Sequence, residues 1–88
     1  MKITKRKEGK AMVIAVEGRL DAVSAPAFDT ELETLLEAGE KTLVLDFQNL
    51  EYISSAGLRS ILAVTKRLRG LEGRIALSSL KDIVGEVF

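Results

Sequence analysis

The chain has 88 residues, 47% of them hydrophobic and 30% charged, which indicates one globular domain over residues 1–88 rather than a disordered segment. Its 13 basic residues balance its 13 acidic residues, so it lacks the basic excess of a general nucleic-acid binder. It contains no histidine and no cysteine, which excludes a Ser-His-Asp triad, a Cys-His pair, a phosphohistidine carrier and the usual zinc site. We therefore expect a protein that is not an enzyme and that uses no cofactor and no metal.

Signals for membranes or export are also missing from the sequence. No apolar run approaches the roughly 20 residues that span a bilayer. The first ten residues, MKITKRKEGK, lack the apolar stretch of a signal peptide. Without cysteine there is no disulfide framework to suggest secretion. We expect a cytoplasmic protein that does not insert into a membrane and does not bind nucleic acid directly.

A pair of strands is predicted at the start of the chain. The run AMVIAVEG, residues 11–18, is apolar and rich in β-branched residues, and a glycine stops it. The preceding KITKR, residues 2–6, is suited to be its antiparallel partner across a turn at residues 8–10.

The segment GRLDAVSAPAF, residues 18–28, leads into a first predicted helix. Pro26 suits the first turn of a helix, and Ser24 stands where an N-cap is expected. Gly39 is placed to end the helix. Apolar residues at i, i+4, i+7 and i+8 predict one buried stripe, formed by Phe28, Leu32, Leu35 and Leu36.

The second half of the chain predicts a strand, a helix and another strand. KTLVLDF, residues 41–47, is a short apolar run typical of a strand buried on both faces. GRIAL, residues 73–77, is the second strand, and the helix between them should end near Gly70. The apolar stripe expected on this helix consists of Leu58, Ile61, Leu62, Thr65 and Leu68.

A third helix is expected at the end of the chain, with Ser79 as its cap and Asp82 completing a capping box. Its apolar stripe is still running at Phe88, so we expect the last helix to be truncated and the natural domain to extend further. Strand–helix–strand order over residues 42–78 implies a parallel pair with a right-handed crossover. The predicted fold is α/β, with a mixed, mostly parallel four-stranded sheet packed with helices.

The junction Ser54-Ser55-Ala56-Gly57, between a strand-like segment and a helix, is the main functional candidate. On spacing alone, an ordinary N-cap at Ser55 or Ser54 is the favoured interpretation. A phosphate cradle is weaker because one glycine without G-K-[ST] is no Walker loop, and a serine nucleophile is weaker still because no histidine can activate it.

Modification by another protein is the fourth interpretation of the junction. Ala56 and Gly57 leave the helix start uncrowded, so a partner or a kinase could reach Ser55. A phosphate there would add roughly −1.5 to −2 charge. The helix dipole favours such an anion by about 0.3–1 kcal/mol, so the fold would tolerate it while a docked interface would not. We expect Ser55 to serve both as cap and as switch.

Charge is balanced in total but divided along the chain. Residues 2–10 and 59–74 are mainly basic, whereas residues 29–40 hold five acids and no base. Solvated helix faces explain most of these residues. A polarised surface that steers a protein partner is the alternative.

Three segments, GRLDAVSAPAF, LVLDFQNLEYISSAGLRSIL and IALSSLKDIVGEVF, resemble the STAS domain of stand-alone bacterial anti-sigma factor antagonists. The resemblance covers nearly the whole chain and is most specific over residues 43–62. It implies a four-stranded, mostly parallel sheet and a partner-switching function. The unphosphorylated antagonist binds an anti-sigma factor that is also a serine kinase, phosphorylation of a serine releases it, and a phosphatase restores it.

The family pattern places the modified serine at Ser55, and Ser54 stands where the family has an aspartate. Asp21 falls on a family aspartate beside the same surface, where it polarises the serine, contacts the partner or simply forms a turn. Arg59 is expected to be exposed and to contact the partner, and Asp46 to order its loop. The expected partner-binding residues are Asp21, Ser54, Ser55, Ala56, Gly57, Leu58, Arg59 and Leu62, of which the two leucines also lie on the predicted core stripe.

Two other functions stay open at this point. A STAS module of a membrane transport or lipid transport system would have the same fold. A small nucleotide-binding module would bind ATP or GTP as an isolated domain. The sequence does not identify the oligomeric state, the partner kinase or the sigma factor.

Overall fold

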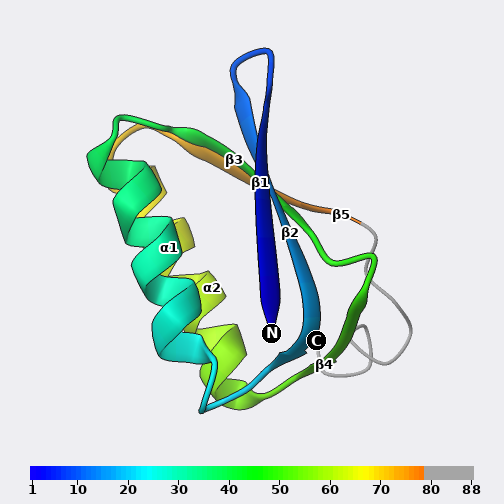
Figure 1. Cartoon of the computed structure of the whole chain (residues 1–88). Helices are drawn as coiled ribbons and strands as arrows, with labels where there is room; N and C mark the ends of the chain where they lie inside the picture. The colour runs from blue at the N-terminus through cyan, green and yellow to red at the C-terminus, as the bar shows by residue number, and fades with distance from the viewer. Residues whose placement is uncertain (79–88) are drawn as a thin grey trace.

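The computed structural model describes residues 1–78, and the predicted third helix, from Ser79 to Phe88, lies outside the described residues. The described part forms five strands and two helices: β1 (Lys2–Glu8), β2 (Ala11–Leu20), α1 (Ala25–Glu37), β3 (Thr42–Asp46), β4 (Leu50–Ile53), α2 (Ser55–Gly70) and β5 (Arg74–Ser78). The helices lie side by side along one face of the sheet (Figure 1).

The sheet confirms the predicted mixed, mostly parallel class. β1 pairs with β2 in the antiparallel sense, and β2, β3 and β5 follow one another as parallel neighbours. β4 also runs parallel to β2 and pairs with its last residues, after a register shift between Gly18 and Arg19. This sheet therefore contains one strand more than the four predicted. β4 has only four residues, with Leu50 and Ile53 buried at a spacing of three, so it carries no alternating pattern.

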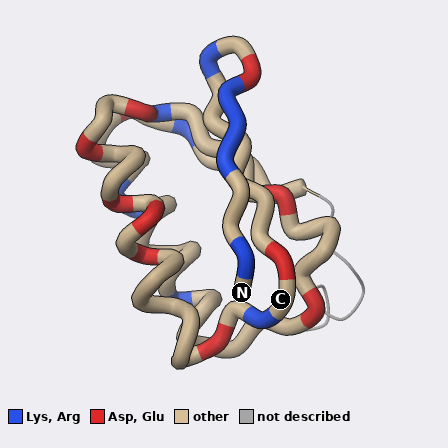
Figure 2. The backbone as a smooth tube through the Cα atoms, in the orientation of Figure 1, with Lys and Arg blue, Asp and Glu red and all other residues tan. Residues whose placement is uncertain are grey.

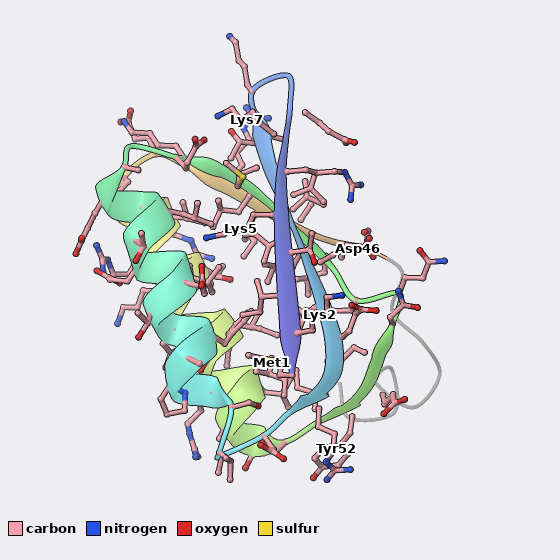
Figure 3. The ribbon with its side chains drawn as sticks, viewed as in Figure 1. Met1, Lys2, Lys5, Lys7, Asp46 and Tyr52 are labelled. Carbon is pink, nitrogen blue, oxygen red and sulfur yellow. The ribbon has the colours of Figure 1, made fainter. Side chains whose placement is uncertain are left out.

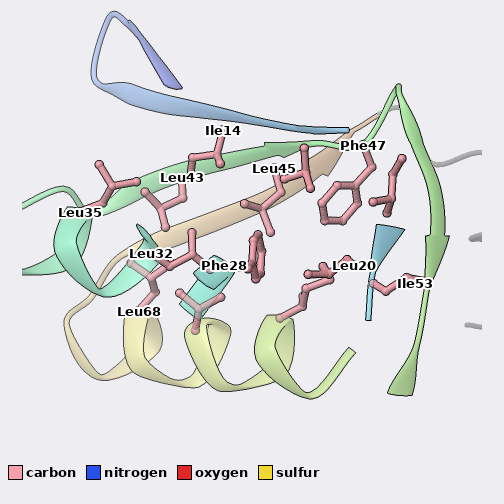
Figure 4. Close-up of a cluster of buried hydrophobic side chains, with 14 of the residues drawn as sticks. Ile14, Leu20, Phe28, Leu32, Leu35, Leu43, Leu45, Phe47, Ile53 and Leu68 are labelled. Atoms are coloured by element: carbon pink, nitrogen blue, oxygen red, sulfur yellow. The ribbon is translucent and has the colours of Figure 1, made fainter. Parts of the chain in front are cut away.

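The core lies between the sheet and the two helices, as Figure 4 shows. Phe28, Leu32, Leu35 and Leu36 of α1 are all buried, which confirms the predicted stripe. Gly39 has φ +92, and its amide donates to the carbonyl of Leu36 at 3.0 Å, so it ends the helix as expected.

The predicted stripe of α2 is partly wrong. Ile61 and Leu68 are buried as expected, and Leu58 is half-buried against the core. Leu62, however, is 67% exposed, and Val64 fills the core position instead. Each residue turns the helix by about 100°, so the residue after Ile61 points well away from the sheet. An apolar residue next to a buried one on a helix can therefore be mistaken for core.

Candidate functional site

The start of α2 is capped by Ser54. Its backbone has left the helix (φ −94, ψ 175), and its hydroxyl accepts a hydrogen bond from the Gly57 amide at 3.4 Å. The Ser54 amide is bonded to the carbonyl of Leu20 at 2.9 Å, which anchors the junction to the end of β2. The prediction that Ser55 is the cap is wrong, because Ser55 is already the first residue of the helix.

The side chain of Ser55 is consequently not needed to cap the helix. It is exposed, and within residues 1–78 its hydroxyl takes part in no hydrogen bond. Ser54 stands where the resemblance places an aspartate. Aspartate and serine are both preferred N-caps, so either residue could cap the helix at this position.

Gly57 holds the helix start close to the sheet. A Cβ atom on this residue would lie 2.8 Å from the Leu20 carbonyl oxygen and from Leu20 Cγ, and 2.9 Å from Ile53 Cγ1. The glycine is buried, so it shapes the site by packing and does not offer a surface to a partner. The expectation that it leaves the helix start uncrowded is wrong on this inner side. The neighbouring Ala56 is half-buried.

Asp21 forms the turn between β2 and α1. Its Oδ1 accepts from the amides of Val23 at 3.1 Å and Ser24 at 3.2 Å. These bonds, above all the one from the Ser24 amide, lower the pKa of the Asp21 carboxyl below its ordinary value. The Arg19 guanidinium, 3.6 Å away, acts in the same direction. No hydrogen bond joins Asp21 to Ser55 within the described residues, so the contacts of Asp21 are those of a turn former.

Ser24 occupies the predicted N-cap position of α1, but its side chain does not cap the helix. Its hydroxyl donates to the carbonyl of Arg19 at 2.8 Å and accepts from the amide of Asp21 at 2.9 Å. The hydroxyl therefore closes the loop that lies beside the start of α2. Arg19 also places its guanidinium over the ring of Tyr52, 4.3 Å from the centroid, which joins the loop to β4 (Figure 3 labels Tyr52).

An open groove of about 390 Å³ runs between α1 and α2 near Ser55. Small side chains line it, among them Ala25, Ala56 and Ala63, with Asp29 from α1 and Arg59 from α2 as charged members. Arg59 is exposed, as predicted. Asp46 lies outside this region, where its carboxylate accepts from the Gln48 amide at 3.0 Å and orders the loop after β3, also as predicted.

Ser55, Arg59 and Leu62 come together on the outer face of α2, whereas Leu58 and Gly57 turn inward. The capping role of Ser54 was the feature that the sequence did not resolve, since two adjacent serines fit the same pattern.

Among residues 1–78, no group of three or more acidic side chains could hold a metal ion. No helix of the described part is long and apolar enough to cross a membrane.

The chain is similar to known proteins over nearly its whole length. Residues 3–88 match the family described as "Mlab, STAS domain". A putative anti-sigma factor antagonist, BtrV of Bordetella bronchiseptica, is 40% identical over 88 residues, which cover all of this chain and 76% of that protein.

Solved structures share the fold at lower identity. A putative anti-sigma factor antagonist from Thermotoga maritima superposes with a TM-score of 0.91 at 21% identity, over 97% of this chain and 74% of that one. The Bacillus cell fate determinant SpoIIAA in its phosphorylated form superposes with a TM-score of 0.81 at 21% identity, over 99% of this chain and 80% of that one.

Proposed function

The chain belongs to the STAS domain family, among the anti-sigma factor antagonists, and on that premise we propose that it works by partner switching at Ser55. In its unphosphorylated form it binds an anti-sigma factor that is also a serine kinase, and this binding frees a sigma factor. Phosphorylation of Ser55 releases the antagonist, and a phosphatase restores it. The domain is therefore a substrate and a ligand, and it acts in the cytoplasm without catalysing a reaction.

The different roles of the two serines support this proposal, since one caps the helix and the other is exposed. Ser54 provides the cap, so the hydroxyl of Ser55 can be modified without removing a bond that the fold needs. Ser55 is exposed on the first turn of a 16-residue helix, where the helix dipole favours negative charge. An accessible hydroxyl with a separate cap suits a switch that leaves the domain folded.

The chemical step belongs to the kinase. The Ser55 Oγ forms a bond to the γ-phosphorus of ATP while the bond from that phosphorus to the β,γ-bridging oxygen breaks, and ADP leaves. The hydroxyl proton passes to a base of the kinase. The product carries roughly −1.5 to −2 charge at a surface that was uncharged at this position.

Phosphate mapping tests the proposal. The domain is incubated with ATP and the purified anti-sigma factor kinase encoded in the same genome, and the phosphate is located by mass spectrometry. We expect modification of Ser55 and none of the Ser55→Ala variant, with Ser54→Ala as the matched control that is still modified. Modification that persists in Ser55→Ala would overturn the assignment.

A further inference from the structure

The two helices carry opposite charge. α2 contains Arg59, Lys66, Arg67 and Arg69 and no acidic residue. α1 contains Asp29, Glu31, Glu33 and Glu37 and no basic residue. Figure 2 shows the acidic positions repeated along α1. Although the net charge of the chain is zero, α1 is therefore acidic and α2 is basic.

Two of the four acidic residues of α1, and Glu40 just after it, are paired with cations of the domain. Lys5 of β1 contacts Glu31 at 2.6 Å, Lys7 contacts Glu40 beyond the end of α1, and Arg67 contacts Glu33 (Figure 3 labels both lysines). The cations Arg59, Lys66 and Arg69 differ from these. Within residues 1–78, none of the three has a carboxylate oxygen within 4.0 Å.

These three cations share one side of α2 with Ser55 and Leu62. The successive spacings of four, three, four and three residues place them within a stripe about 80° wide on a helix of 3.6 residues per turn. The stripe lies opposite the buried residues Gly57, Ile61, Val64 and Leu68. We call it the α2 stripe, and it consists of Ser55, Arg59, Leu62, Lys66 and Arg69.

Leu62 gives the α2 stripe an apolar centre. Its side chain is 67% exposed, with Arg59 one turn before it and Lys66 one turn after it. A docked helix face would bury this side chain and gain free energy from the apolar surface that it removes from water. An apolar centre with charged residues on either side is compatible with an interface that has an apolar core and a polar rim.

We propose that the α2 stripe docks an acidic surface of the anti-sigma factor, with an apolar depression that receives Leu62. This inference rests on the proposed function and names the chemistry of the partner. A second copy of the chain is a poorer occupant, because two of the four acids on its α1, Glu31 and Glu33, are already paired with Lys5 and Arg67. The contact therefore extends well past Ser55, along the helix to Arg69.

The position of Ser55 at the head of the α2 stripe explains the direction of the switch. A phosphate on Ser55 would lie one turn from Arg59, and residues four apart on a helix are neighbours. The phosphate charge would offset the guanidinium charge and repel the acidic surface of the partner. Release then requires no conformational change of the domain.

Charge reversal along the α2 stripe tests the proposal. Association with the purified anti-sigma factor kinase encoded in the same genome is measured at increasing NaCl for the wild type and for Arg59→Glu, Lys66→Glu and Arg69→Glu. We expect each reversal to slow association by about tenfold and to weaken its salt dependence. Lys10→Glu, in the exposed turn between β1 and β2, makes the same change of charge elsewhere and should associate as the wild type does.

The outcomes separate the two proposals. Wild-type binding with unchanged association of the Lys66→Glu and Arg69→Glu variants would overturn the α2 stripe and leave the switch at Ser55 standing. No wild-type binding would overturn both. A wild type that dimerises at low salt, with Arg59→Glu monomeric by sedimentation, would place a second copy on the α2 stripe and contradict the proposed partner. Circular dichroism of each variant confirms that it is folded.

Discussion

The Ser54 hydroxyl accepts a hydrogen bond from the Gly57 amide at 3.4 Å, so the cap of α2 comes from the serine before the proposed switch. Ser54 therefore has a structural role, whereas the adjacent Ser55 does not cap the helix. Where the resemblance places an aspartate, this chain thus has another residue type that is preferred as an N-cap.

Replacing the two serines should give opposite results in stability and modification. We expect Ser54→Ala to lower the free energy of unfolding by about 0.5–2 kcal/mol, because the Gly57 amide loses its partner. Ser55→Ala should change it by less than about 0.5 kcal/mol, since the side chain is exposed. Urea denaturation measures both, and a larger loss for Ser55→Ala would show that Ser55 is the cap.

Gly57 should not tolerate a methyl group. Gly57→Ala brings a Cβ within 2.8 Å of the Leu20 carbonyl oxygen, and backbone cannot move aside as a flexible side chain can. We expect a net loss of about 1–3 kcal/mol in urea denaturation, because overpacking outweighs the better helix propensity of alanine. Gly70→Ala, where an added Cβ meets no atom within 4 Å, is the matched control and should be neutral or stabilising.

Leu62 and its neighbour Ile61 should differ sharply. Leu62 is 67% exposed and Ile61 only 4%, although they are adjacent on α2. We expect Leu62→Ala to leave stability within about 0.5 kcal/mol. Ile61→Ala should cost about 2–5 kcal/mol, because it leaves a cavity. Thermal unfolding of both variants checks the difference, and a destabilised Leu62→Ala would return Leu62 to the core.

Asp21 should make stability depend on pH in the acid range. Its folded pKa is lowered, so its contribution is present above the unfolded value of about 3.9 and is lost as the pH falls through the folded value. Asp21→Asn keeps an acceptor oxygen but carries no charge. We expect the wild type to melt at a higher temperature than Asp21→Asn at neutral pH and the difference to vanish in strong acid. A difference that does not change with pH would contradict the charged turn.

Much of the fold could be predicted because its local and tertiary signals agree. The stripe of α1 follows from its apolar spacing, and Gly39 ends that helix as expected. α2 ends at Gly70 as predicted, but the residue that turns left-handed after it is Glu72. β4 could not be predicted, since four residues are too few to show a period and its pairing depends on the register shift at Gly18. The side chain of Ser24 was also misjudged, because its hydroxyl is taken by a loop carbonyl that only the folded chain brings near.

The location of the candidate site could be predicted, but not which of the two serines caps the helix. A small-residue junction before a helix indicates a cap and an accessible hydroxyl, but adjacent serines fit both roles. The backbone dihedrals decide between them, since Ser54 is extended and Ser55 is helical. The inward role of Gly57 likewise depends on how closely α2 approaches Leu20 and Ile53.

Binding of the anti-sigma factor kinase to the domain carrying phosphoserine at position 55 tests the switch most directly. The phosphoserine is installed during translation, and mass spectrometry confirms that it lies at position 55. The affinity is then measured by calorimetry beside that of the unmodified domain. We predict that the unmodified domain binds, that the phosphorylated one remains folded by circular dichroism, and that it binds at least about tenfold more weakly, a loss of about 1.4 kcal/mol. Equal affinity of the two folded forms would contradict the account.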